Sequence, residues 1–200
     1  LTTVFALFIS SLAGYGFEIF RSKNKDRVFS LLLCSMMVPF CSLMVPLYRM
    51  FAAVNKSSEL LGGIFGLGSF SSVILSTAFL IFFFRQNSKY FPRETLEAAR
   101  IDGLSEIGIF FKMYIPIMKS TYAAGGIITF MNAWNNYLWP LVTLSGDNRT
   151  IPLLLSAMGS SYTPDYGMIM LGIVIATLPT ALIFFLLQKH FVAGMLGSVK

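Results

Sequence analysis

Side chains that could carry out catalysis are scarce in this sequence. The 200 residues include only one histidine and two cysteines. His190 has no second histidine or cysteine near it at the spacing of a metal site. Cys34 and Cys41 share one apolar run, where a thiol packs as a small hydrophobic group. No Gly-x-x-x-x-Gly-Lys-Ser/Thr loop is present to bind phosphates. The sequence therefore predicts no catalytic residues, no metal and no bound cofactor.

A second group of candidate residues combines amides with aromatic rings. Trp134, Asn135, Asn136 and Tyr137 are consecutive near the end of an apolar run, and Asn132 precedes them. Amides are costly to turn toward lipid, whereas sugars stack on aromatic rings and hydrogen-bond to amides. A belt of aromatic residues at a membrane surface is the alternative, because Trp and Tyr collect there without any ligand. We favour a solute path at these residues.

The third group lies in a polar stretch between two apolar runs. Pro92 fits the first turn of a helix, acidic residues follow it, and Gly103 fits the position just after a helix end. These residues predict a short helix that ends near Asp102. Ser105 can cap a second short helix, which we expect to end at the break before Pro116.

Long apolar runs position these groups along the chain. Hydrophobic residues make up 56% of the sequence and charged residues 12%, far from the balance of a soluble domain. Five runs are long enough to cross a bilayer as helices, and they cover residues 1–20, 28–48, 61–84, 120–142 and 166–188. The sequence predicts an all-α membrane protein with about five transmembrane helices.

Basic residues predict the orientation of these helices. Twelve of the fifteen Lys and Arg residues follow the first, third or fifth run, as in cytoplasmic loops; Arg49, Lys56 and Arg149 lie on the opposite side. The amino end then lies outside and the carboxyl end in the cytoplasm. The net charge of +6 reflects this topology, and we expect no nucleic acid partner. Since the chain opens inside an apolar run, we expect a fragment of a six-span subunit that lacks the first span.

The polar stretch resembles the EAA loop of ABC importer permeases. The matching positions are Glu97, Ala98, Ala99, Asp102, Gly103 and Pro116. Residues 134–141, Trp-Asn-Asn-Tyr-Leu-Trp-Pro-Leu, are similar to a segment of the carbohydrate-uptake, maltose-transporter-like permeases, with Asn136 where a Glu is usual. The resemblance covers nearly the whole chain and is closest to the second permease of the pair.

The resemblance implies one importer transmembrane domain over residues 1–200, partial at its amino end, with a coupling loop at about 92–116. It also implies a prokaryotic cell membrane and a set of partners. These are membrane lipid, a second permease subunit, an ABC ATPase dimer that binds ATP and Mg²⁺, an extracytoplasmic solute-binding protein and a sugar. The loop with Asp147, Asn148 and Arg149 is a candidate contact for the binding protein.

Other classes of membrane protein remain open. A permease for a non-sugar solute, such as a polyamine, phosphate or an amino acid, is the main alternative. Secondary carriers and channels usually place ionisable groups at mid-membrane, and none lies deep within the five runs. A membrane-embedded enzyme would need a nucleophile with its base or a metal cluster, and the sequence offers neither.

Overall fold

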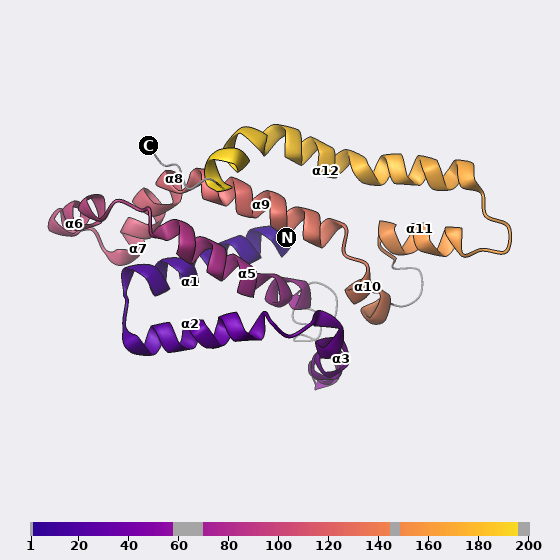
Figure 1. Cartoon of the computed structure of the whole chain (residues 1–200), viewed down its shortest axis with the longest axis horizontal. Helices are drawn as coiled ribbons and strands as arrows, with labels where there is room; N and C mark the ends of the chain where they lie inside the picture. The colour runs from indigo at the N-terminus through magenta and orange to yellow at the C-terminus, as the bar shows by residue number, and fades with distance from the viewer. Residues whose placement is uncertain (1, 58–69, 145–148, 196–200) are drawn as a thin grey trace.

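The computed structural model describes residues 2–57, 70–144 and 149–195 (Figure 1). Within these ranges the chain is helices and turns without a strand, which confirms the all-α prediction. The helices are α1 (Thr2–Ile19), α2 (Lys23–Ser35), α3 (Phe40–Ser57), α5 (Phe70–Ser88), α6 (Arg93–Ile101), α7 (Glu106–Ile109), the π-helical turn η1 (Phe110–Tyr114), α8 (Ile115–Ile117), α9 (Lys119–Trp134), α10 (Leu138–Thr143), α11 (Ile151–Gly159) and α12 (Tyr166–Met195).

Two helices of the described ranges, α1 and α12, are long and apolar enough to cross a membrane. The run 28–48, predicted as one helix, is divided into α2 and α3, which are bent by 105° at the break. Pro39 lies at this break; it has no N–H to donate and disfavours the helical conformation of the residue before it. The prediction of one unbroken helix was therefore wrong here, and the count of five spans stays a prediction.

The other predicted runs fare differently. The upstream part of the run 61–84, with Gly62 and Gly66, lies outside the described residues, and its downstream part forms α5. The run 120–142 is interrupted, since α9 ends at Trp134 and α10 begins at Leu138. Amide side chains compete for backbone groups at this interruption. The run 166–188 is a continuous helix within α12, as predicted.

Small residues bring α1 and α5 close together. Ala6, Ser10 and Gly14 recur every four residues on α1, and all three are buried. A β-carbon added at Gly14 would lie 2.6 Å from the β-carbon of Phe84 on α5. Small residues at this spacing let two helix backbones approach closely in a membrane, where apolar burial alone gives little drive for association. The α1–α5 pair is therefore closely packed along these small residues.

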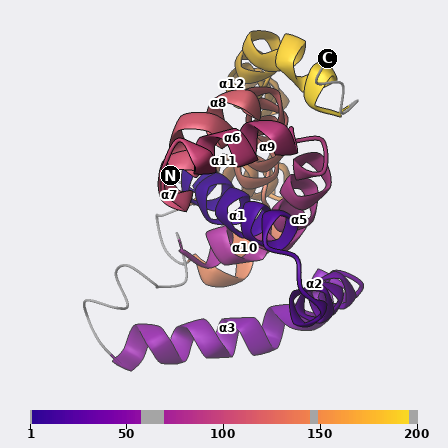
Figure 2. The same ribbon diagram turned by 90° about the vertical axis from the view of Figure 1, so that its left-hand side faces the viewer.

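The remaining helices surround this pair. α1 also packs on α9, and α12 runs along both α9 and α11 (Figure 1). Figure 2 shows α2 and α3 below the other helices, at one side of the molecule. None of the apolar window of α12 is buried, so this helix presents large side chains outward along its length. Such a surface fits lipid or another apolar helix better than water.

Candidate functional site

The predicted short helix is present as α6, Arg93–Ile101. Pro92 stands at its N-cap. Glu94 lies in its first turn and Arg100 in its last, so both charges interact favourably with the helix dipole. The helix follows Phe91, which is buried at 3% exposure and anchors the start of the segment. The sequence therefore placed this helix to within one residue at each end.

Gly103 ends α6 in the way that the sequence predicted. Its φ of +79° is the one positive value among the described residues. The Gly103 N–H donates to the Arg100 carbonyl at 3.1 Å, and the Leu104 N–H donates to the Ala99 carbonyl at 3.0 Å. These two bonds form a Schellman motif, whose left-handed residue is usually glycine because a β-carbon is strained there.

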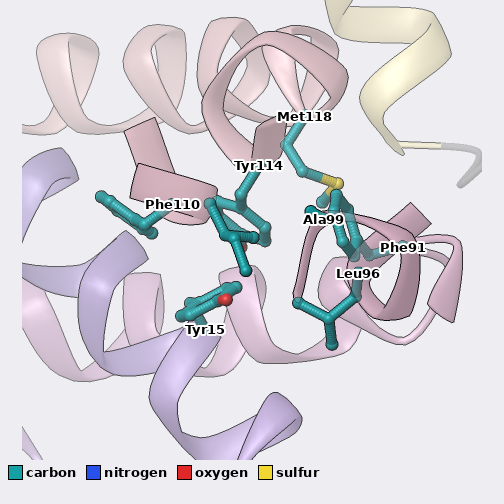
Figure 3. Packing of buried hydrophobic residues seen from close by; sticks show 8 residues of the cluster. Tyr15, Phe91, Leu96, Ala99, Phe110, Tyr114 and Met118 are labelled. Atoms are coloured by element: carbon teal, nitrogen blue, oxygen red, sulfur yellow. The ribbon is translucent and has the colours of Figure 1, made fainter. Parts of the chain in front are cut away.

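The two faces of α6 differ sharply. Leu96 and Ala99 are buried at 5% and 3% exposure in an apolar cluster with Tyr15, Phe91, Ile109, Phe110, Tyr114 and Met118 (Figure 3). Glu97, Ala98 and Ile101 are exposed, and the side chain of Ile101 is 86% accessible. The sequence treated Ala98 and Ala99 alike, but the fold turns Ala99 inward and leaves Ala98 on the free face.

The second short helix begins as predicted and ends later than predicted. Ser105 Oγ accepts from the Gly108 N–H at 3.2 Å and caps α7. The helix does not break before Pro116. It continues through η1, where the Ile115 N–H donates to the Phe110 carbonyl, and the bend falls at Met118. The wider π-turn lets the helical path continue through Pro116, which has no N–H to donate.

Glu106 joins this segment to the first helix. One carboxylate oxygen accepts from Arg100 Nε at 2.7 Å, and the other accepts from the Tyr15 hydroxyl at 3.2 Å. Deeper in the cluster, the hydroxyls of Tyr114 and Ser88 lie 2.6 Å apart. Burial raises the pKa of Tyr114, so its hydroxyl stays neutral and tethers η1 to α5.

A charge network lies at the start of α6. The Glu18 carboxylate on α1 is only 3% exposed, and it pairs with Arg21, with Arg85 Nε at 3.7 Å and with Arg93 Nη2 at 3.9 Å. Arg85 also binds Asp26 on α2 and lies over the ring of Phe29, 3.9 Å from its centroid. The ends of α1, α5 and α2 thus meet the beginning of α6 through charged side chains.

The amide and aromatic residues only partly share one site. A cavity of about 540 Å³ is bordered by α3, α5, α9 and the α9–α10 connection, and it is lined by Phe40, Phe79, Leu80, Ile128, Thr129, Asn132, Ala133, Asn136, Tyr137 and Leu138. Asn136 and Tyr137 therefore line this cavity, together with Asn132. A second cavity of about 310 Å³ shares Tyr137, whose hydroxyl lies 3.2 Å from Ser156 Oγ.

Trp134 and Asn135 do not line either cavity. Trp134 Nε1 donates to the Ala176 carbonyl of α12 at 3.0 Å, and its ring stacks on Phe130. Asn135 Nδ2 donates to the Met131 carbonyl at 3.0 Å, at the end of α9. The two residues thus contribute to helix packing and to the helix end in this structure.

The sequence missed the aromatic walls of the larger cavity. Phe40 and Phe79 come from α3 and α5, far along the chain from the amides. In a sequence with 20 phenylalanines, no local signal separates these two from those that face lipid. Thr129 lies three residues before Asn132 on the same side of α9, and helical spacing back from Asn132 would have found it.

Comparison with known proteins gives the family. A family model described as the binding-protein-dependent transport system inner membrane component matches residues 5–197. The chain is 50% identical over 199 residues to the lactose transport system permease protein LacG of Rhizobium radiobacter, covering 99% of this chain and 70% of that protein.

Two further relatives cover the same part of their own chains. The arabinooligosaccharides transport system permease protein AraQ of Bacillus subtilis is 39% identical over 204 residues, with 100% of this chain and 69% of that protein covered. The sn-glycerol-3-phosphate transport system permease protein UgpE of Pectobacterium atrosepticum is 30% identical over 201 residues, with 99% and 69% covered. The chain therefore belongs to the family of inner membrane components of binding-protein-dependent transport systems.

Proposed function

We propose that this chain is a permease subunit of an ATP-driven importer for a sugar or oligosaccharide. It works with a second permease subunit, an ATPase dimer that holds ATP and Mg²⁺, and an extracytoplasmic solute-binding protein. The main support is the 50% identity to a lactose permease, together with relatives named for arabinooligosaccharides and starch degradation products.

The coupling role falls to the exposed face of α6. Leu96 and Ala99 fasten the helix to the apolar cluster, so its outer face projects from a packed base. That outer face carries Glu97, Ala98 and the 86% exposed Ile101, and Ile107 of α7 is 72% exposed beside it. Apolar side chains so exposed in a polar loop fit a surface that a partner covers. A groove of the ATPase is the partner that the family supplies.

The solute path runs through the larger cavity. Its described lining offers two amides, one phenol, one threonine hydroxyl and two phenylalanine rings, and no charged residue among the described residues that border it. Amides and hydroxyls pair with sugar hydroxyls, and rings stack on the apolar faces of a sugar. An anionic solute such as a phosphate ester would call for a basic residue in the lining. This composition supports a neutral sugar over sn-glycerol-3-phosphate.

In this proposal the basic stretches that follow the first and third apolar runs face the cytoplasm, and the carboxyl end lies on the same side. The contacts of Glu18 with Arg85 and Arg93 support a common side, because they join the end of α1 to the segment that begins after α5. The ATPase must bind on that side, where ATP is available.

The experiment measures ATPase recruitment by the assembled permease pair. Glu97→Lys reverses a charge on the free face of α6, and Glu97→Gln, the matched control, removes that charge without reversing it. We expect Glu97→Lys to weaken ATPase binding and solute-stimulated hydrolysis more than Glu97→Gln does. Normal binding and hydrolysis in both variants would contradict the coupling role. Uptake of lactose, arabinooligosaccharides and sn-glycerol-3-phosphate by the same complex in proteoliposomes tests the solute class.

A further inference from the structure

Two polar contacts from α1 hold the two ends of α6. Tyr15 donates to Glu106, which accepts from Arg100 in the last turn of α6. Glu18 pairs with Arg93, the first residue of α6, at 3.9 Å. Tyr15 and Glu18 are three residues apart and lie on one side of α1, whereas Arg93 and Arg100 are separated by two helical turns, about 10 Å along the axis.

The contacts differ in strength and in kind. The contact through Glu106 acts in series: the carboxylate must hold both Tyr15 and Arg100 for force to pass through this contact from α6 to α1. The contact at Glu18 acts in parallel with it. The Arg93 side chain is 69% exposed, so solvent weakens its attraction to Glu18, although the carboxylate itself is only 3% exposed. Between the two ends, Leu96 and Ala99 pack in the cluster that contains Tyr15 (Figure 3).

Resting on the proposed function, we infer that Glu106 is a positioning residue that transmits movement of α6 to α1, with the Glu18–Arg93 pair as a second, weaker contact. Attachment at both ends resists rotation as well as translation of α6. Movement delivered to α1 reaches the larger cavity, because α1 packs on α5 and α9, and both of these helices line that cavity. Movement of α6 is therefore passed to α1, and α1 transmits it to the helices that line the cavity.

The series arrangement makes the inference testable by a double-mutant cycle. Tyr15→Phe removes one hydroxyl, Arg100→Gln removes the other partner of Glu106, and the double variant removes both. The whole importer in proteoliposomes is assayed for ATP hydrolysed per solute imported. Each single variant should raise this ratio by about 2- to 5-fold, the range that one partly exposed charged contact supports. The double variant should match the single variants, since a series fails at its first broken link.

The matched control is Lys89→Gln, which removes a positive charge from an exposed residue of the same loop. It should leave the ratio unchanged. Arg93→Gln combined with Arg100→Gln should exceed either alone, because those contacts act in parallel. The amount of assembled complex after size-exclusion chromatography detects a folding defect. If a variant does not assemble, Glu106→Gln takes its place in the cycle, because it keeps the side chain's shape and loses its charge.

Two results would overturn the inference. One is a normal ratio in Tyr15→Phe and Arg100→Gln; the other is an additive effect in their double variant. Either result leaves the coupling role of α6 intact as long as Glu97→Lys still weakens ATPase binding. If Glu97→Lys also binds the ATPase normally, the proposed function fails first, and the two failures are thereby distinguished.

Discussion

Replacing Gly103 with valine tests the end of α6 with little steric disturbance. A β-carbon added at this position meets no atom within 4 Å, so the β-carbon itself displaces no neighbour. The backbone does have to change, because its φ of +79° lies in the left-handed region that β-branched residues avoid. The perturbation is therefore confined to the turn that closes the helix.

The cost follows from that geometry. A residue with a β-carbon pays about 1–2 kcal/mol to adopt the left-handed conformation, and more if it is β-branched. Without the turn, the bonds from Gly103 to Arg100 and from Leu104 to Ala99 are lost. If only the intact turn docks, its population and hence the affinity for the ATPase fall by about 5- to 30-fold.

The assay titrates the purified permease pair with the ATPase and compares three variants. Gly103→Val should show the full loss of affinity. Gly103→Ala should lie between it and the wild type. Gly103→Asn should retain most of the affinity, because asparagine tolerates the left-handed region best among residues with a β-carbon. Equal affinity for valine and asparagine would refute the reasoning, since the variants would then not sense the turn.

Three further predictions concern other parts of the chain. Gly14→Ala should lower the amount of assembled complex through an overpacking cost of about 1–3 kcal/mol, because the new β-carbon would lie 2.6 Å from that of Phe84; size-exclusion chromatography measures it. Asn136→Ala should reduce solute uptake more than Asn135→Ala, since Asn136 alone of the two lines the larger cavity; equal effects in a transport assay would contradict the path. A cysteine at Lys25 should resist an impermeant thiol reagent in intact cells, and labelling there would reverse the proposed topology.

The sequence predicted α6 well because its signals are local. A proline at the start, acidic residues in the first turns and a glycine after the end each act within a few residues. The cap at Ser105 was found for the same reason. The continuation of the helix through Pro116 was missed, because a π-turn is a response to tertiary packing and has no short-range signature.

The apolar runs predicted helices but not their breaks. Hydropathy averaged over the length of a span registers composition, and it does not locate the breaks at Pro39 and at residues 135–137, where the helices end. The partners of charged residues were also beyond sequence reasoning. The burial of Glu18 and its pairing with Arg85 and Arg93 depend on how α1 meets α5 and α6.

The four-residue stripe on α1 sets where this protein can bend. Ala6, Ser10 and Gly14 leave no slack between α1 and α5, and Glu18 continues the same spacing to bind Arg85 at the end of the stripe. Two helices packed at such short range move as one rigid unit. We expect opening and closing of the solute path to occur where the helices are interrupted, at the α2–α3 bend and at the unwound residues 135–137. The α1–α5 pair should keep its internal packing during that movement.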